Sequence, residues 1–388
     1  MMWNPDSSNI PVATKNPEIT HILNHLERSI SRITELVAIN PPEAVIEMLT
    51  QPATSLVRLS IQTTKPTAVP SLFGGVMPKL QDLTISNPVG WKLRLFQNLG
   101  TVHLLGTPSK RWRLSGLLDC IDASTVIKEL HLSCFDNFEP ETSAESRRMV
   151  SLPSLHILRL TLCDSALIID RLEIPPSATL SIYGSCGHSE DILACLPGSS
   201  RFLRMLKGTR FLTVVLDVER QIFEVDIMGP EGIHLTVGTV PLQGALDRKW
   251  VLRSMAAIVR LAPISEVKWL TVVVDEFCMP WNVWLSKFDK VSTLEVRCPD
   301  PAELLGALAA RIGETERIVC PALRSLSVEC GECPTVDSSL LRKCLEIRAL
   351  AGSVVSALNL NDSQWTTIPQ TELDAWERLI CHTRLDGE

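Results

Sequence analysis

The chain has 388 residues, of which 45% are hydrophobic and 21% are charged. This composition is typical of a folded protein and excludes intrinsic disorder as the state of most of the chain. The formal net charge of −7 argues against a surface that follows nucleic-acid phosphates, so we expect no nucleic-acid partner.

The N-terminal residues 1–16 are polar, contain two prolines and are predicted to be disordered. They lack the apolar core of a signal peptide. No apolar run in the chain approaches the roughly 18 residues that a membrane-spanning helix needs. We therefore expect a cytoplasmic or nuclear protein without membrane contact, whose 12 cysteines remain reduced thiols.

Two histidines, His21 and His25, lie four residues apart on a helix predicted over residues 19–30, with Glu18 on the same face. That spacing can bind zinc, but no third ligand is evident, and a solvent-facing pair is the preferred interpretation.

A short apolar pattern recurs along the chain: an apolar residue, two others, a second apolar residue, one other, and a third apolar residue. The last two apolar residues are separated by one, so both side chains lie on one face of a strand. Most copies follow one another at about 20–30 residues, close to the period of leucine-rich repeats. Weaker copies lie at Ile33-Leu36-Ala38, Leu180-Ile182 and Leu212-Val214. The clear copies are Leu56-Leu59-Ile61, Leu80-Leu83-Ile85, Leu99-Val102-Leu104, Ile127-Leu130-Leu132, Leu155-Leu158-Leu160, Val267-Leu270-Val272, Val291-Leu294-Val296, Leu323-Leu326-Val328 and Val355-Leu358-Leu360.

Amphipathic helices are predicted between many of these strands, over residues 41–49, 113–121, 246–261, 301–312 and 338–349. A strand followed by a helical crossover, repeated, places parallel strands side by side. The sequence therefore predicts an α/β fold, an irregular leucine-rich-repeat solenoid with a curved parallel sheet backed by helices. An ordinary doubly wound α/β domain is the alternative. The shortness, alternation and number of the strands disfavour it.

Residues 218–244 depart from the repeat. Alternating strands over residues 223–227 and 233–237 flank the turn signal Gly229-Pro230-Glu231-Gly232, which predicts a β-hairpin insertion. The predicted organisation is a disordered N-terminus (1–16), an N-terminal repeat run (17–217), the hairpin (218–244), a C-terminal repeat run (245–365) and a C-terminal cap or tail (366–388).

Candidate chemical motifs are few. Cys330 and Cys333 form a CxxC pair, but structural zinc usually needs two such pairs, and Cys330 occupies an inward position after its strand. Cys186 and His188, with Asp191 nearby, are more simply a loop than a thiol–imidazole pair. Gly74-Gly75 marks a turn, and no phosphate-binding or nucleophile motif is present. The sequence thus predicts no catalytic residue, metal or cofactor.

The outward strand positions are the candidate binding surface, because solenoids expose them as one extended face. Among them His103, His131 and Arg159 occupy successive strands and form the predicted protein-binding patch. The alternative is that each of these residues is an ordinary solvent-exposed sheet residue that binds no partner. The outward positions are Ser60, Thr84, His103, His131, Arg159, Thr271, Glu295 and Ser327.

Residues 152–184 carry a family resemblance. Leu152-Pro153-Ser154-Leu155, the strand after it, Pro175-Pro176 and the strand at 179–183 resemble a segment common in fungal F-box leucine-rich-repeat proteins, especially of mushroom-forming fungi. The order of later elements, including the strand at 322–328, is also similar, so the resemblance spans residues 30–365. It implies substrate recognition for a cullin-type ubiquitin ligase. The F-box that would bind a Skp-type adaptor is not visible before the first repeat.

Three classes of function remain open at this point. The first is a substrate receptor of the ubiquitin system, which the resemblance implies. The second is a leucine-rich-repeat scaffold without a ligase link, and the third is an enzyme of unrecognised type. Of these, the sequence favours a non-catalytic protein-binding module over an enzyme.

Overall fold

The chain forms two compact units in the computed structural model, Met1–Gly184 and Ser185–Glu388, called here the first and the second unit. The structure describes residues 21, 25, 28–41, 45, 49, 51–63, 72–88, 98–107, 111–122, 126–139, 148–184, 196, 202, 206, 208–217, 219–220, 222–229, 234–239, 248–260, 264, 266–275, 279–312, 317–330, 337–360, 368–380 and 382–383. The predicted disordered segment 1–16 lies outside them.

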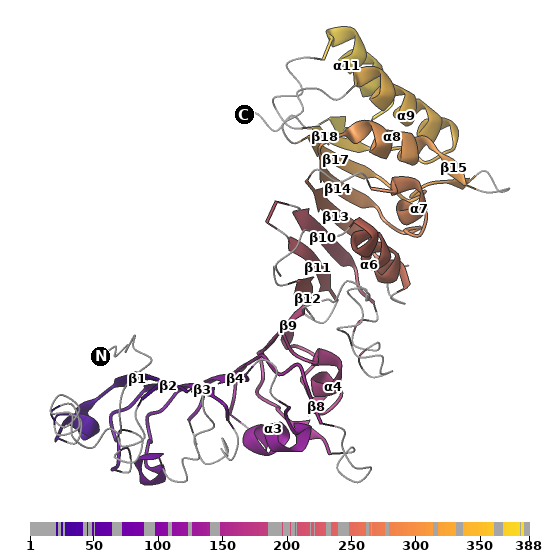
Figure 1. Ribbon diagram of the computed structural model, residues 1–388. Coiled ribbons are helices and arrows are strands. Elements are labelled where there is room, and N and C mark those ends of the chain that lie inside the picture. The colour runs from indigo at the N-terminus through magenta and orange to yellow at the C-terminus, as the bar shows by residue number, and fades with distance from the viewer. Residues whose placement is uncertain are drawn as a thin grey trace. The chain divides into compact units, whose positions relative to one another are not determined.

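The first unit is built on a sheet in which neighbouring strands run parallel (Figure 1). In spatial order they are β1 (Glu35–Ile39), β2 (Arg58–Gln62), β3 (Asp82–Ser86), β4 (Thr101–Leu105), β5 (Glu129–Ser133), β7 (Ile157–Thr161) and β9 (Thr179–Gly184). β6 (Val150–Ser151) and β8 (Leu172–Glu173) form a separate parallel pair. The helical segments are η2 (Ile30–Arg32), η3 (Leu72–Gly75), α3 (Leu114–Ile121) and α4 (Ser165–Ile169).

The second unit contains a mixed sheet whose antiparallel strands come first. In spatial order these strands are β12 (His234–Thr239), β11 (Ile222–Met228), β10 (Phe211–Asp217), β13 (Trp269–Val274), β14 (Thr293–Cys298), β17 (Ser325–Cys330), β18 (Ala357–Leu360) and β19 (His382–Thr383). Pairing is antiparallel from β12 to β10 and parallel from β10 to β19. A separate antiparallel pair joins β15 (Arg311–Ile312) and β16 (Arg317–Ile318).

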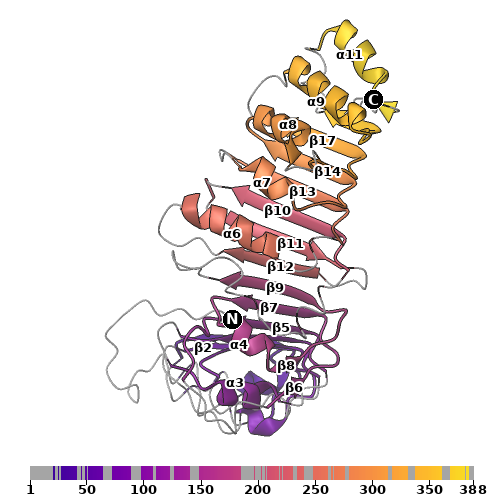
Figure 2. The same ribbon diagram turned by 90° about the vertical axis from the view of Figure 1, so that its right-hand side faces the viewer.

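Helices back one face of this second sheet, and they follow one another along it (Figures 1 and 2). The helices are α6 (Arg248–Arg260), α7 (Trp281–Leu285), α8 (Pro301–Ala309), α9 (Ser338–Leu350) and α11 (Gln370–Glu377). The prediction of an α/β fold with a largely parallel, unclosed sheet and helices is confirmed, and this arrangement is consistent with a leucine-rich-repeat-like solenoid.

The predicted hairpin is confirmed, since β11 and β12 pair antiparallel. The antiparallel ribbon also includes β10, which pairs antiparallel with β11 on one side and parallel with β13 on the other. The weak repeat copy at Leu212-Val214 therefore lies in β10, the strand at which pairing changes from antiparallel to parallel. Most of the predicted turn, residues 230–232, lies outside the described part of the chain, as does residue 233 of the predicted second strand.

Strand register aligns the repeat positions in layers. In the first unit Leu83 pairs with Leu59 on one side and with Val102 on the other, and Leu130 pairs with Leu158. These side chains are almost fully buried, and the residues between them point to the opposite face. The second unit repeats the arrangement with Leu270, Leu294, Leu326 and Leu358. Each repeat therefore buries its apolar face only against its neighbours.

Polar side chains connect successive repeats where the strands end. Asn87 follows β3 in a left-handed conformation, with φ of 53°. Its amide nitrogen donates to the Thr63 carbonyl at 2.7 Å, and its amide oxygen accepts from the Thr107 hydroxyl at 2.5 Å. After β7, the Cys163 thiol donates to the Leu132 and Thr161 carbonyls at 3.3 Å each. These side chains thus link each turn to a carbonyl at or near the end of the preceding strand.

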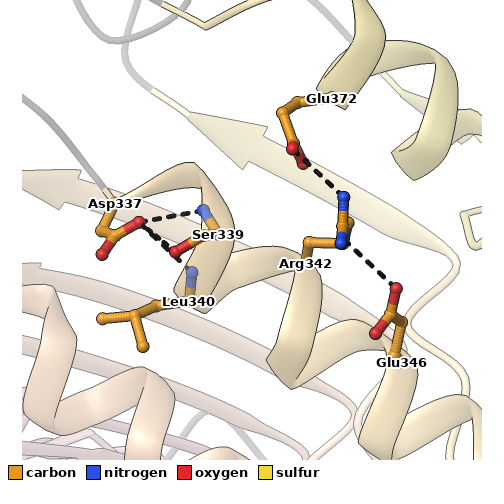
Figure 3. Close-up of polar contacts among 6 residues, drawn as sticks. All are labelled: Asp337, Ser339, Leu340, Arg342, Glu346 and Glu372. Carbon is orange, nitrogen blue, oxygen red and sulfur yellow. Dashed lines mark hydrogen bonds and ion pairs between the residues drawn. The ribbon is translucent and has the colours of Figure 1, made fainter.

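Helix α9 begins at a side-chain cap (Figure 3). The Asp337 carboxylate accepts hydrogen bonds from the backbone N–H groups of Ser339 at 2.9 Å and Leu340 at 3.4 Å. On the exposed side of the helix, Arg342 pairs with Glu346 at 3.3 Å and with Glu372 of α11 at 3.2 Å. These contacts fix where the helix starts and connect it to the next one.

A buried arginine on the same helix stabilises the packing of α9 on α8. Arg348 is 0% exposed, and burial lowers its pKa. Its guanidinium donates to the carbonyls of Leu308 at 3.0 Å, Val319 at 2.8 Å and Cys320 at 2.7 Å. Leu308 lies in the last turn of α8, where carbonyls lack partners within the helix. The positive charge is therefore stabilised by the negative end of a helix and by two further carbonyl dipoles.

None of the helices in the described ranges is long and apolar enough to cross a membrane.

Replacing this arginine tests its structural role. Arg348→Ala removes the guanidinium donor from three carbonyls and opens a cavity, so we expect a loss of about 3 kcal/mol or more in the free energy of unfolding. Arg342→Ala is the matched control on α9, because its half-exposed ion pairs contribute about 1 kcal/mol at most. Urea denaturation followed by circular dichroism measures both. Equal losses in the two variants would contradict the role assigned to Arg348.

Candidate protein-binding surface

The candidate surface is the face of the first unit's sheet that points away from the buried leucines. Strand pairing places one outward residue of each strand beside the next, and we call this set the outward row. The outward row consists of Val37, Ser60, Thr84, His103, His131, Arg159 and Ser181.

The structure brings the three predicted residues together. His103 of β4 pairs directly with His131 of β5, which pairs with Arg159 of β7. The two imidazole rings stack, with centroids 4.1 Å apart and planes inclined by 14°. The close spacing follows from parallel pairing, which sets neighbouring strands about 4.8 Å apart. The sequence separation between these residues, 28 in each step, gives no direct indication of a ring stack.

The electrostatic environment keeps both histidines neutral. The His131 side chain is only 18% exposed, and its pKa is lowered to about 4, first by burial and then by the repulsion it would meet from a protonated His103 ring and from Arg159. Burial is also the largest cause of the lowered pKa of His103. Because both rings are uncharged near neutral pH, they can stack without repulsion. His131 Nε2 is buried and has no hydrogen-bond partner among the described residues, although Glu129 Oε2 lies 4.0 Å away.

Arg159 provides the free cation of this patch. It is exposed, and within the described part of the chain its side chain forms no hydrogen bond or ion pair. Arg58, on the same sheet, is by contrast held between Glu35 at 3.6 Å and Asp82 at 3.0 Å. An open guanidinium is suited to a carboxylate, which it binds through two parallel hydrogen bonds. The patch therefore combines a flat neutral surface with one available positive charge.

The outward positions predicted for the later repeats lie in the second unit. There Thr271 pairs with Glu295, and Glu295 pairs with Ser327. The Thr271 hydroxyl donates to Glu295 Oε2 at 3.2 Å, so that carboxylate already has a partner. These residues form a separate, mainly polar surface.

The other candidate motifs provide no assembled site. His21 and His25 are exposed, whereas Glu18, Cys333, Cys186, His188 and Asp191 lie outside the described residues. Cys330 is buried and pairs in register with Cys298, as expected for an inward strand position. Gly74 and Gly75 have φ of 62° and 75° within a turn. Among the residues that the structure describes, no three His, Cys, Asp or Glu side chains could hold a metal ion.

Sequence reasoning did not single out one feature of the second unit, an exposed row formed by Met228, Phe211 and Trp269. The available signal was a large apolar residue at an outward position of an alternating strand, as in Phe211-Leu212-Thr213.

Comparisons with known proteins do not assign the chain to a family. No family model, no curated protein and no solved structure matches it. The structure supports one part of the resemblance, a long and mostly parallel sheet with helices.

The lowered pKa values lead to a direct test by nuclear magnetic resonance. We expect the His131 imidazole to titrate near pH 4 and His103 below the ordinary value of about 6.5. Arg159→Gln should raise both pKa values while burial keeps them depressed. Arg113→Gln is the control and should change neither, because Arg113 pairs with Glu139 and neither group acts on the two rings. Titration of both rings near pH 6.5 would contradict the description of the patch.

The same shifts predict how stability depends on pH. Because His131 binds its proton more weakly in the folded state, the unfolded chain takes up more protons between about pH 4 and pH 6.5. The free energy of unfolding should therefore fall as pH is lowered through this window. His131→Gln cannot take up the proton and should flatten the dependence, as measured by urea denaturation at a series of pH values.

Proposed function

We propose that this chain is a non-catalytic protein-binding module whose contact patch is the His103, His131 and Arg159 group of the outward row. The observation that carries the proposal is the direct pairing of these three residues on adjacent strands, with an exposed arginine beside a neutral ring stack. Their strands and the ring stack hold the two imidazoles in place, so these two side chains lose little conformational entropy on binding. Its partner would place an acidic side chain at Arg159 and an apolar or planar group on the imidazoles.

Aromatic and arginine side chains dominate the energetics of many protein interfaces, which supports this choice of patch. The mainly polar positions around it, including Ser60 and Thr84, are suited to the solvated rim of such an interface. A cytoplasmic or nuclear partner is part of the proposal.

A triple variant tests the proposed patch. His103→Ala, His131→Ala and Arg159→Ala together should abolish binding of any partner that the wild-type chain enriches at least tenfold in quantitative affinity purification. The variant Ser60→Ala with Thr84→Ala is the matched control on the same face and should retain that partner. Circular dichroism establishes that each variant is folded. A partner retained by the folded triple variant would refute the patch.

A narrower form of the proposal is that the module recognises substrates for a cullin-type ubiquitin ligase. The resemblance of residues 152–184 to fungal F-box leucine-rich-repeat proteins favours it. A leucine-rich-repeat scaffold without a ligase link is the other form. An enzyme would require a pocket with converging ionisable groups.

Expression of the tagged protein from its own gene distinguishes the two forms. The ligase form predicts co-purification of a Skp-type adaptor and a cullin in amounts comparable with the bait. Their absence from a purification that recovers other partners would favour the scaffold. The triple variant should keep a Skp-type adaptor, because the adaptor would contact a different segment, and lose the substrate.

A further inference from the structure

A row of large apolar side chains crosses three neighbouring strands of the second unit. Phe211 of β10 pairs in register with Met228 of β11 on one side and with Trp269 of β13 on the other. Phe211 and Met228 are each 43% exposed, and Trp269 is 40% exposed. The Phe211 and Trp269 rings lie 5.9 Å apart. Figure 1 shows the three strands side by side.

The row is not part of the core. The next residues along these strands, Leu212 and Leu270, are buried, as is Ile227, which precedes Met228. Since strand side chains alternate, Met228, Phe211 and Trp269 belong to the opposite face. Single exposed apolar residues are normal on protein surfaces, but contiguous ones mark interaction sites. Three large side chains in register on adjacent strands form such a contiguous surface.

The charges beside the row are positive and available. Arg210 and Lys268 immediately precede Phe211 and Trp269, and the backbone N–H of Lys268 donates to the Arg210 carbonyl at 2.9 Å. Both side chains are exposed, and neither forms an ion pair or side-chain hydrogen bond within the described ranges.

Two described carboxylates near the row, those of Glu266 and Asp226, already have partners. Glu266 binds Lys290 at 2.6 Å, and Asp226 accepts from the Thr236 hydroxyl at 2.5 Å with His234 at 3.5 Å. Among the described residues at the starts of β10 and β13, the exposed charges without a partner are therefore those of Arg210 and Lys268.

We propose that Met228, Phe211 and Trp269, together with Arg210 and Lys268, form a docking surface for an acidic, apolar peptide segment of a partner protein. A large apolar side chain of the segment lies against the row, and an adjacent aspartate or glutamate binds Arg210 and Lys268. The combination selects acidic over basic sequences because like charges beside the row would repel. The surface belongs to the second unit and does not depend on the patch proposed above.

A displayed library of random 12-residue peptides, selected on the full-length chain, tests the surface. Selected peptides should contain an aspartate or glutamate next to Trp, Phe, Leu or Met. Synthetic copies should lose about tenfold or more in affinity for Trp269→Ser, measured by fluorescence anisotropy. Lys268→Glu should weaken binding by a similar factor at low salt and by less at high salt.

Val283→Ser is the matched control, because Val283 is also apolar and 69% exposed but lies on α7. It should bind the selected peptides as the wild type does. The triple variant of His103, His131 and Arg159 should also bind them unchanged, which separates this surface from the first patch. Selection of basic peptides, no selection, or equal binding by Trp269→Ser would overturn the proposal. Self-association of the chain that Trp269→Ser abolishes would overturn it as well, since a second copy would then occupy the surface.

Discussion

Strand register is the constraint on which both units depend. Leu59, Leu83, Val102, Leu130 and Leu158 form one buried layer because each strand pairs with the next without an offset. A shift by one residue would turn every one of these side chains toward solvent and bury the residues between them. The same register decides the outward face. His103 meets His131, and Phe211 meets Trp269, because the leucines or valines beside them are already aligned.

The turns and helices maintain that register in different ways. Asn87 and Cys163 donate to carbonyls at or near the end of the preceding strand, and so link each turn to the repeat before it. In the second unit the Arg348 guanidinium donates hydrogen bonds to one carbonyl of α8 and to two carbonyls of the segment after it. Both kinds of side chain supply additional donors to backbone carbonyls near the ends of strands and helices. An irregular repeat can therefore stack closely although its connections vary in length.

The two proposed surfaces differ in chemistry. In the first unit, burial and nearby positive charge keep the imidazoles neutral and leave Arg159 as the available cation. In the second unit the exposed row is apolar, with cations at one end. Both are suited to acidic partners, even though the chain has a net charge of −7. Local charge at an interface, and not the total, determines which partner is attracted.

The sequence by itself determined the strands that carry the repeat, their inward residues and the hairpin, because these follow from local periodicity and turn chemistry. It also placed His103, His131 and Arg159 on successive strands. Only the tertiary structure decided that the two imidazoles stack, that His131 is largely buried, and that Arg348 binds carbonyls far from it in the chain. It likewise decided that Met228, Phe211 and Trp269 form one row. Those contacts depend on which strands and helices become neighbours, and pairing across dozens of residues leaves no local signal in the chain.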